Sequence, residues 1–205
     1  DLPERALGER GKARPPEDGG EPFERWALKE RAKVMGLMPR SGGPHWGMIR
    51  DAQKGHLPEK LVEEGTLQRV QIEGSRRIFL MPVGFLEQRP SDHREDMILL
   101  GPLEPLLWDR KLVQQIFDFE YLWEVYKPEA KRRWGWYVCP LLHRGELVGR
   151  LEGRVEEGVL SIKTLWEERR GSVDPVALDA LLESHGQALG ASDFKRPKRS
   201  KWRVG

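Results

Sequence analysis

The feature that most constrains this chain is a change in the spacing of its apolar residues near Pro90. Before Pro90 the apolar residues recur at the three- to four-residue spacing of helices, and after it they mostly alternate, as in strands with one buried face. A chain of 205 residues is long enough for two small domains with cores of their own. We therefore predict an α+β protein with a helical domain followed by a mostly antiparallel β domain.

The first part of the chain has the element order of a winged helix. The expected elements are three helices and then two strands, over residues 23–37, 46–52, 58–64, 67–72 and 77–81. Pro58 at a first helical turn and Gly65 just after the same helix are typical helix boundaries. Three helices followed by a two-stranded ribbon form a winged helix, a variant of the helix-turn-helix. We assign residues 21–90 to this domain and residues 1–20, rich in Gly, Pro and charge, to a linker from a preceding domain.

The second part predicts an antiparallel sheet. The expected elements are a strand, a helix, four strands and a last helix, over residues 97–100, 105–117, 121–126, 136–143, 146–155, 159–166 and 175–189. Short Gly-containing turns between the later strands favour a meander that curls towards a barrel. Asp174 and Pro175 are typical of the start of the C-terminal helix. We assign residues 91–190 to this domain and residues 191–205 to a basic tail.

Composition excludes several classes of protein. No apolar run approaches the ~18 residues of a membrane span, and the first residues do not form a signal peptide. The five histidines have no metal-ligand spacing, and Cys139 lies in an apolar strand as a core thiol, so we predict no metal and no cofactor. A single cysteine excludes an internal disulfide and fits a cytoplasmic protein, which we expect to be monomeric. The net charge of +2 means that any nucleic-acid binding must depend on local clusters.

The strongest local cluster is YKPEAKRRWGWY, residues 126–137, with four basic groups and four aromatic rings. Consecutive cations on a turn can contact phosphates, and Trp134 and Trp136 could stack on an exposed base. The alternative is a solvated turn whose rings pack the sheet. Alternation along a strand places Trp136 and Tyr137 on opposite faces, so we expect at least one ring in the core.

Two other basic segments are candidates for DNA contact. The ribbon of the winged helix carries Arg69, Arg76 and Arg77, and the tail over residues 195–203 has six basic residues and no acidic one. In contrast, the helix at 58–64 carries one Lys and three Glu, whose carboxylates would repel phosphate. The winged helix is therefore interpreted as a scaffold with a basic wing, or as an ordinary charged hairpin.

The segment from residue 99 to residue 153 resembles the carboxy-terminal part of the winged-helix DNA glycosylases that unhook interstrand crosslinks. The resemblance rests on five short pieces: Asp109-Arg110, Trp123-Glu124-Val125-Tyr126, Pro128, Ala130-Lys131-Arg132-Arg133 and Val148-Gly149-Arg150. The opening Asp1-Leu2-Pro3-Glu4-Arg5 also resembles a segment between winged helices of that family. The resemblance implies DNA repair, with double-stranded DNA as partner and hydrolysis of the N-glycosidic bond of an alkylated purine as the reaction.

Two departures from the family pattern limit what the resemblance implies. Glu104 and Glu152 stand where the family often has aspartate. The family's catalytic signature is a glutamine, a hydrophobic residue and then glutamine or aspartate, and it lies in the amino-terminal part of the full-length proteins. Gln71-Ile72-Glu73 imitates it, but on the expected wing, where we interpret it as a solvent-facing strand. We expect this chain to hold DNA and to lack the catalytic motif, so its own enzymatic activity is left open.

These arguments give one set of DNA-contacting candidates and two other interpretations. The candidates are Lys131, Arg132, Arg133, Trp134, Arg150, Arg76 and Arg77. We expect the first three to be exposed on one face together with Arg150 or the wing arginines, and Trp134 to lie nearest the lesion. The alternatives are a winged-helix transcriptional regulator with a ligand- or partner-binding β domain, and a non-enzymatic interaction module.

Overall fold

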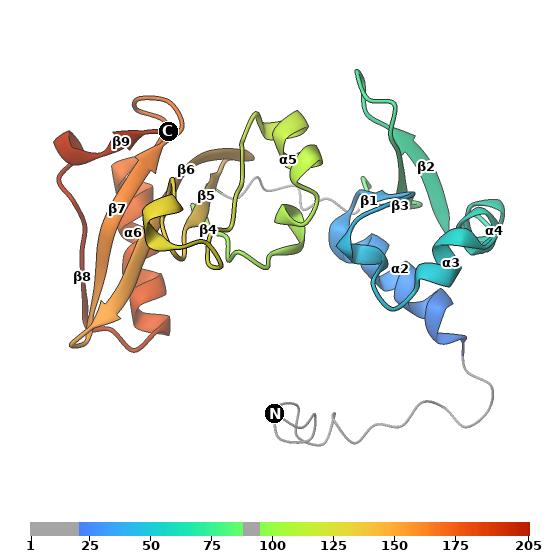
Figure 1. Ribbon diagram of the computed structural model, residues 1–205, viewed down its shortest axis with the longest axis horizontal. Helices are drawn as coiled ribbons and strands as arrows, with labels where there is room; N and C mark the ends of the chain where they lie inside the picture. The colour runs from blue at the N-terminus through green and yellow to red at the C-terminus, as the bar shows by residue number, and fades with distance from the viewer. Residues whose placement is uncertain (1–20, 88–94) are drawn as a thin grey trace. The chain divides into compact units, whose positions relative to one another are not determined.

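The computed structural model describes residues 21–87 and 95–205, in two compact units, Asp1–Gln88 and Arg89–Gly205 (Figure 1). Each unit has its own sheet and its own apolar core. The fold is α+β with mostly antiparallel strand pairing, as predicted. Within the described part of the chain, every helix is too short or too polar to cross a bilayer.

The N-terminal unit has the element order predicted for a winged helix. Its elements are α2 (Phe23–Met35), β1 (Met38–Pro39), η2 (Pro44–Trp46), α3 (Arg50–Lys54), α4 (Leu57–Glu63), β2 (Leu67–Gln71) and β3 (Ile78–Pro82). The strands form an antiparallel sheet in the order β1-β3-β2. The short strand β1 was not predicted, and the helix expected at 46–52 is replaced by a 3-10 turn and the short α3.

Helix α2 shows why this unit folds locally as it does. Its apolar positions Ala27, Leu28 and Ala32 are buried against the sheet and the other helices. Gly36 ends the helix at φ 66°, a conformation that glycine adopts without the steric cost of a Cβ, and its amide donates to the Ala32 carbonyl. Trp46 is fully buried, and its Nε1 donates to the Pro39 carbonyl at 3.0 Å, so the polar edge of the largest core side chain is satisfied.

The C-terminal unit has a six-stranded sheet and a long helix. Its elements are β4 (Ile98–Leu99), η3 (Pro105–Leu107), α5 (Arg110–Phe117), η4 (Glu129–Lys131), β5 (Cys139–His143), β6 (Glu146–Glu156), β7 (Val159–Glu167), α6 (Pro175–Ala188), β8 (Asp193–Lys195), η5 (Arg199–Lys201) and β9 (Arg203–Val204). The order is β4-β5-β6-β7-β8, with β9 also paired to β7. Helix α6 lies beside the sheet (Figure 1). Its buried Leu178 and Leu182 pack on the sheet, and Asp174 caps its first turn.

The structure corrects four expectations for this unit. Residues 121–126 form no strand, and the helix expected at 105–117 is a 3-10 turn followed by α5, whose N-cap Asp109 accepts from the Leu112 amide at 3.0 Å. In the described residues the sheet stays open and closes no barrel. The basic tail is part of the fold, because β8 and β9 pair with β7 in parallel.

Candidate nucleic-acid interface

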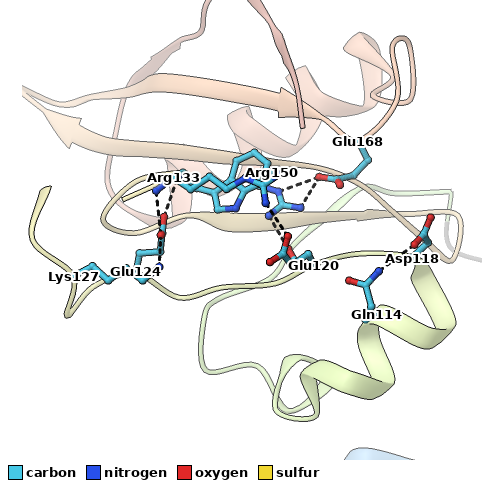
Figure 2. Close-up of polar contacts among 9 residues, drawn as sticks. Gln114, Asp118, Glu120, Glu124, Lys127, Arg133, Arg150 and Glu168 are labelled. Carbon is cyan, nitrogen blue, oxygen red and sulfur yellow. Dashed lines mark hydrogen bonds and ion pairs between the residues drawn. The ribbon is translucent and has the colours of Figure 1, made fainter. Parts of the chain in front are cut away.

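A buried carboxylate holds the backbone of the basic turn, which is the segment of residues 126–137. The side chain of Glu124 is fully buried and accepts hydrogen bonds from the amides of Trp134 at 2.7 Å and Arg133 at 3.1 Å (Figure 2). Lys127 Nζ donates to the same carboxylate at 2.9 Å. Burial alone would raise the pKa of Glu124, but these three donors outweigh it and lower the pKa to about 2. Glu124 is therefore ionised at neutral pH and fixes both ends of the turn.

Arg150 supports the same turn from β6. Its side chain is 2% exposed, and its guanidinium carbon lies 4.0 Å from the ring centroids of both Phe119 and Trp134. Nε and Nη2 donate to Glu168 Oε1 at 3.0 and 2.7 Å, and Nη1 donates to the Glu120 carbonyl at 2.9 Å (Figure 2). Burial lowers the pKa of Arg150, and the Glu168 carboxylate acts in the opposite direction. Each of its three nitrogens donates to a protein atom, so of the two expected neighbours of the turn cations, Arg150 or the wing arginines, Arg150 presents no exposed charge.

Trp134 is also an internal residue. Its side chain packs edge-to-face on Trp166, with ring centroids 5.7 Å apart, and only 9% of the residue is exposed. The indole Nε1 is buried without a hydrogen-bond partner in the described structure. The prediction that Trp134 lies nearest a lesion requires an exposed ring. The Trp134 ring is instead covered by Trp166 and by the Arg150 guanidinium.

The three consecutive cations of the turn have different surroundings. Arg132 is half-buried and donates from Nε to the Lys127 carbonyl at 2.8 Å, so it closes the turn. Lys131 is exposed at the end of the 3-10 turn η4. Arg133 is 57% exposed and pairs with Glu120, with 2.8 Å between Nη1 and Oε2 (Figure 2). Two of the three predicted contacts, Lys131 and Arg133, thus face solvent.

An exposed aromatic surface follows the cations and was only partly anticipated. Tyr126 is 88% exposed, Trp136 54% and Tyr137 43%. Ring contacts through the half-buried Trp123 join them, with centroid distances of 5.8 Å to Tyr126 and 6.5 Å to Tyr137. Trp136 and Tyr137 are both exposed because β5 begins only at Cys139, so strand alternation does not apply to them. The density of rings in 126–137 was the only sequence signal for Tyr137, whereas Tyr126 also belongs to the Trp123-Glu124-Val125-Tyr126 piece of the family resemblance.

The β2–β3 hairpin of the N-terminal unit carries the remaining candidates. Arg76 is exposed, whereas Arg77 is half-buried with its guanidinium carbon 5.0 Å from the Phe79 ring centroid. Gln71, the first residue of the motif that imitates the catalytic signature, donates from Nε2 to the Ser75 carbonyl at 2.6 Å. That amide helps to close the hairpin.

Helix α4 has the features of a scaffold. Glu59 accepts from Arg40 Nε at 2.9 Å and Nη2 at 3.0 Å, and Glu64, just after the helix, lies 2.6 Å from Arg25 Nη2. These pairs tie α4 to neighbouring elements of its own unit. The sequence of α4, LPEKLVE, contains no Arg, Asn or Gln that could read a base edge.

Metal and thiol chemistry have no support in the described residues. Residues 21–87 and 95–205 contain no group of three His, Cys, Asp or Glu side chains that could hold a metal ion. Cys139 is buried, as predicted, and burial raises the pKa of its thiol to about 11, so it is protonated at neutral pH.

Comparison with known proteins adds one finding. The family model described as "DNA glycosylase AlkZ-like" matches residues 1–191, which is most of the chain. No solved structure gives a significant match to the chain.

Proposed function

This chain belongs to the AlkZ-like family of DNA glycosylases, and from that premise we propose that it holds double-stranded DNA through the exposed cations of the 126–137 turn. The observation that supports the proposal most is that Lys131 and Arg133 face solvent on a turn that buried side chains fix from beneath. A rigid turn presents its charges at little further cost in conformational entropy on binding.

The charge pairing of Arg133 leaves it free to exchange partners. Glu120, its partner, is 63% exposed, and exposed ion pairs contribute only about 0–1 kcal/mol. A DNA phosphate, which also releases condensed counterions when it is neutralised, can therefore replace the Glu120 carboxylate. Lys131 has no such competitor among the described residues.

We extend the proposal to the reaction as the resemblance implies it. The family activity would be hydrolysis of the N-glycosidic bond of alkylated or crosslinked purines, with a water placed against the anomeric carbon as positive charge develops on the sugar. Gln71 is engaged in its hairpin, which supports our expectation that the catalytic glutamine signature lies outside this chain. The purified chain should then bind duplex DNA without releasing 7-methylguanine.

The test compares two double variants by fluorescence anisotropy on a fully paired duplex over a range of salt concentrations. In Lys131→Ala/Arg133→Ala, the slope of log affinity against log salt should shrink by up to about 0.9 for each lost phosphate contact. Arg110→Ala/Lys111→Ala removes two exposed charges from α5 of the same unit and serves as the matched control. An unchanged slope in the turn variant, or an equal loss in both variants, would contradict the proposed role of the turn.

A further inference from the structure

A groove of about 610 Å³ lies beside the exposed aromatic rings of the C-terminal unit. Its walls include Trp136, Tyr137, Glu152, Arg154, Glu156 and Lys163. This size lies within the range of sites that bind small organic ligands, such as a nucleotide. The side chains come from the segment before β5 and from the paired strands β6 and β7, so the groove belongs entirely to the C-terminal unit.

The aromatic wall of the groove is held in place through its backbone. Glu152 Oε1 accepts from the amides of Trp136 at 2.7 Å and Tyr137 at 3.4 Å. This close approach requires a glycine at position 135, because a Cβ there would lie 2.7 Å from the Glu152 carboxylate. The segment that carries the rings is therefore fixed although it lies outside the sheet, and a preorganised surface loses little entropy when a ligand binds.

The charges of the groove select one orientation for a nucleotide. Lys163 and Arg154 have side chains that are 74% and 79% exposed, and each is paired with a carboxylate of the groove, Lys163 with Glu152 at 4.0 Å and Arg154 with Glu156. The Glu152 carboxylate is only 15% exposed, and it would repel a phosphate that entered the groove. Exposed ion pairs contribute only about 0–1 kcal/mol, so phosphates can replace the paired carboxylates at Arg154 and Lys163. A base would then enter with its phosphates towards these two cations, and Trp136 offers it a ring on which to stack.

We infer that this groove binds an unpaired nucleotide of DNA, with the base against Trp136 and the flanking phosphates near Lys163 and Arg154. The inference rests on the proposed DNA function and adds to it the state of the DNA that is recognised. In an intact duplex both faces of a base are covered by its neighbours, so a protein ring can stack only on a base that has left the helix. Bulged or damaged sites release a base most easily.

The test uses the full chain and two fluorescent duplexes of the same sequence, one fully paired and one with a single bulged nucleotide. Trp136→Ala should weaken binding of the bulged duplex by on the order of tenfold, which is typical of one lost base–aromatic stack. Its affinity for the paired duplex and its salt slope should stay unchanged. Trp136→Phe, which keeps a ring, should restore part of the preference for the bulge. Trp26→Ala, which removes a 50% exposed indole from the other unit, is the matched control.

The outcomes separate this inference from the proposed function. Wild-type affinity of Trp136→Ala for the bulged duplex would overturn the inference, and so would an equal loss on both duplexes. Neither result would affect phosphate binding by Lys131 and Arg133, which the salt slope on the paired duplex tests. Lys131→Ala/Arg133→Ala could leave that slope unchanged while Trp136→Ala still weakens binding of the bulged duplex. In that case the inference stands and the proposed role of the turn fails.

Discussion

The 126–137 turn and the β2–β3 hairpin both present basic side chains to solvent, but they are built differently. The turn lies on a buried layer in which Glu124 accepts from its backbone and Arg150 stacks beneath Trp134. In the hairpin, backbone pairing and side chains of the hairpin itself, such as the Gln71 amide, hold the tip. The two segments have a similar density of charge in the sequence, but the turn is fixed by buried side chains of its unit, whereas the hairpin is fixed by its own residues. The predictions below test that difference.

The largest expected loss of stability is in Arg150→Ala, because Arg150 is the main buried side chain beneath the turn. Arg150→Ala removes a buried charge from Glu168 and from between two rings, and should lower the free energy of unfolding by about 3 kcal/mol or more. Urea denaturation measures this loss. Arg150→Lys should not restore stability, since an ammonium can neither bridge both partners nor stack as a plane. Arg154→Ala, an exposed arginine on the same strand, should stay within about 0.5 kcal/mol of wild type. A comparable effect in both alanine variants would contradict the distinction.

A second prediction concerns Glu124 and pH. Glu124→Gln places an amide group against two backbone donors, and should lower the free energy of unfolding at neutral pH by roughly 2 kcal/mol. Glu129→Gln, in the exposed part of the turn, should change it little. Urea denaturation of both variants at neutral pH checks this.

The pH dependence of the same variant follows from the pKa of Glu124. The folded-state pKa of about 2 lies below the ordinary value of 4.5, so the unfolded chain takes up the proton first as pH falls. The stability that Glu124 contributes is present above about pH 4.5 and is lost towards pH 2. Glutamine does not titrate, so the stability difference between wild type and Glu124→Gln should shrink over this window. A difference that is constant with pH would show that folding does not lower the pKa of Glu124.

The third prediction concerns the aromatic end of the turn. Gly135→Ala places a Cβ 2.7 Å from the Glu152 carboxylate. The carboxylate must then move away from the backbone amides of Trp136 and Tyr137, which donate to it. We expect a loss of about 1 to 2 kcal/mol in stability and a weaker preference for bulged DNA. Gly101→Ala, where an added Cβ would meet no atom within 4 Å, is the control. Wild-type behaviour of Gly135→Ala in both assays would mean that Glu152 does not hold this segment.

The sequence predicted most elements of the fold because their signals are local. Turn glycines, proline at helix starts and apolar spacing located α2, α4, α6 and the strands β2, β3, β6 and β7 to within a few residues. The strand expected at 121–126 failed for a nonlocal reason. Its aromatic and β-branched residues favour a strand, but Glu124 within it is buried as the acceptor for amides about ten residues away. The parallel pairing of β8 and β9 is equally nonlocal.

The site was predicted as a segment and not residue by residue. Composition located the basic and aromatic turn, and the structure supports Lys131 and Arg133 as exposed groups on it. Charge alone could not separate those residues from Arg150, because a buried arginine requires partners from distant elements, here Phe119 and Glu168. Trp134 and Trp136 are identical in type and two residues apart, and the nonlocal packing of Trp134 on Trp166 and Arg150 decides which one is buried.

The smallest expected effect lies in the hairpin, at Arg76. Its side chain is exposed and, within the described residues, makes no ion pair, so Arg76→Ala should change the free energy of unfolding by less than about 0.5 kcal/mol. Arg77→Ala should cost slightly more, up to about 1 kcal/mol, because it removes a guanidinium from the Phe79 ring. On a paired duplex, Arg76→Ala should reduce the salt slope by no more than about 0.9, the value for one phosphate contact. A larger reduction than in Lys131→Ala/Arg133→Ala would reverse the comparison, since the hairpin would then be the principal DNA contact and the fixed turn the secondary one.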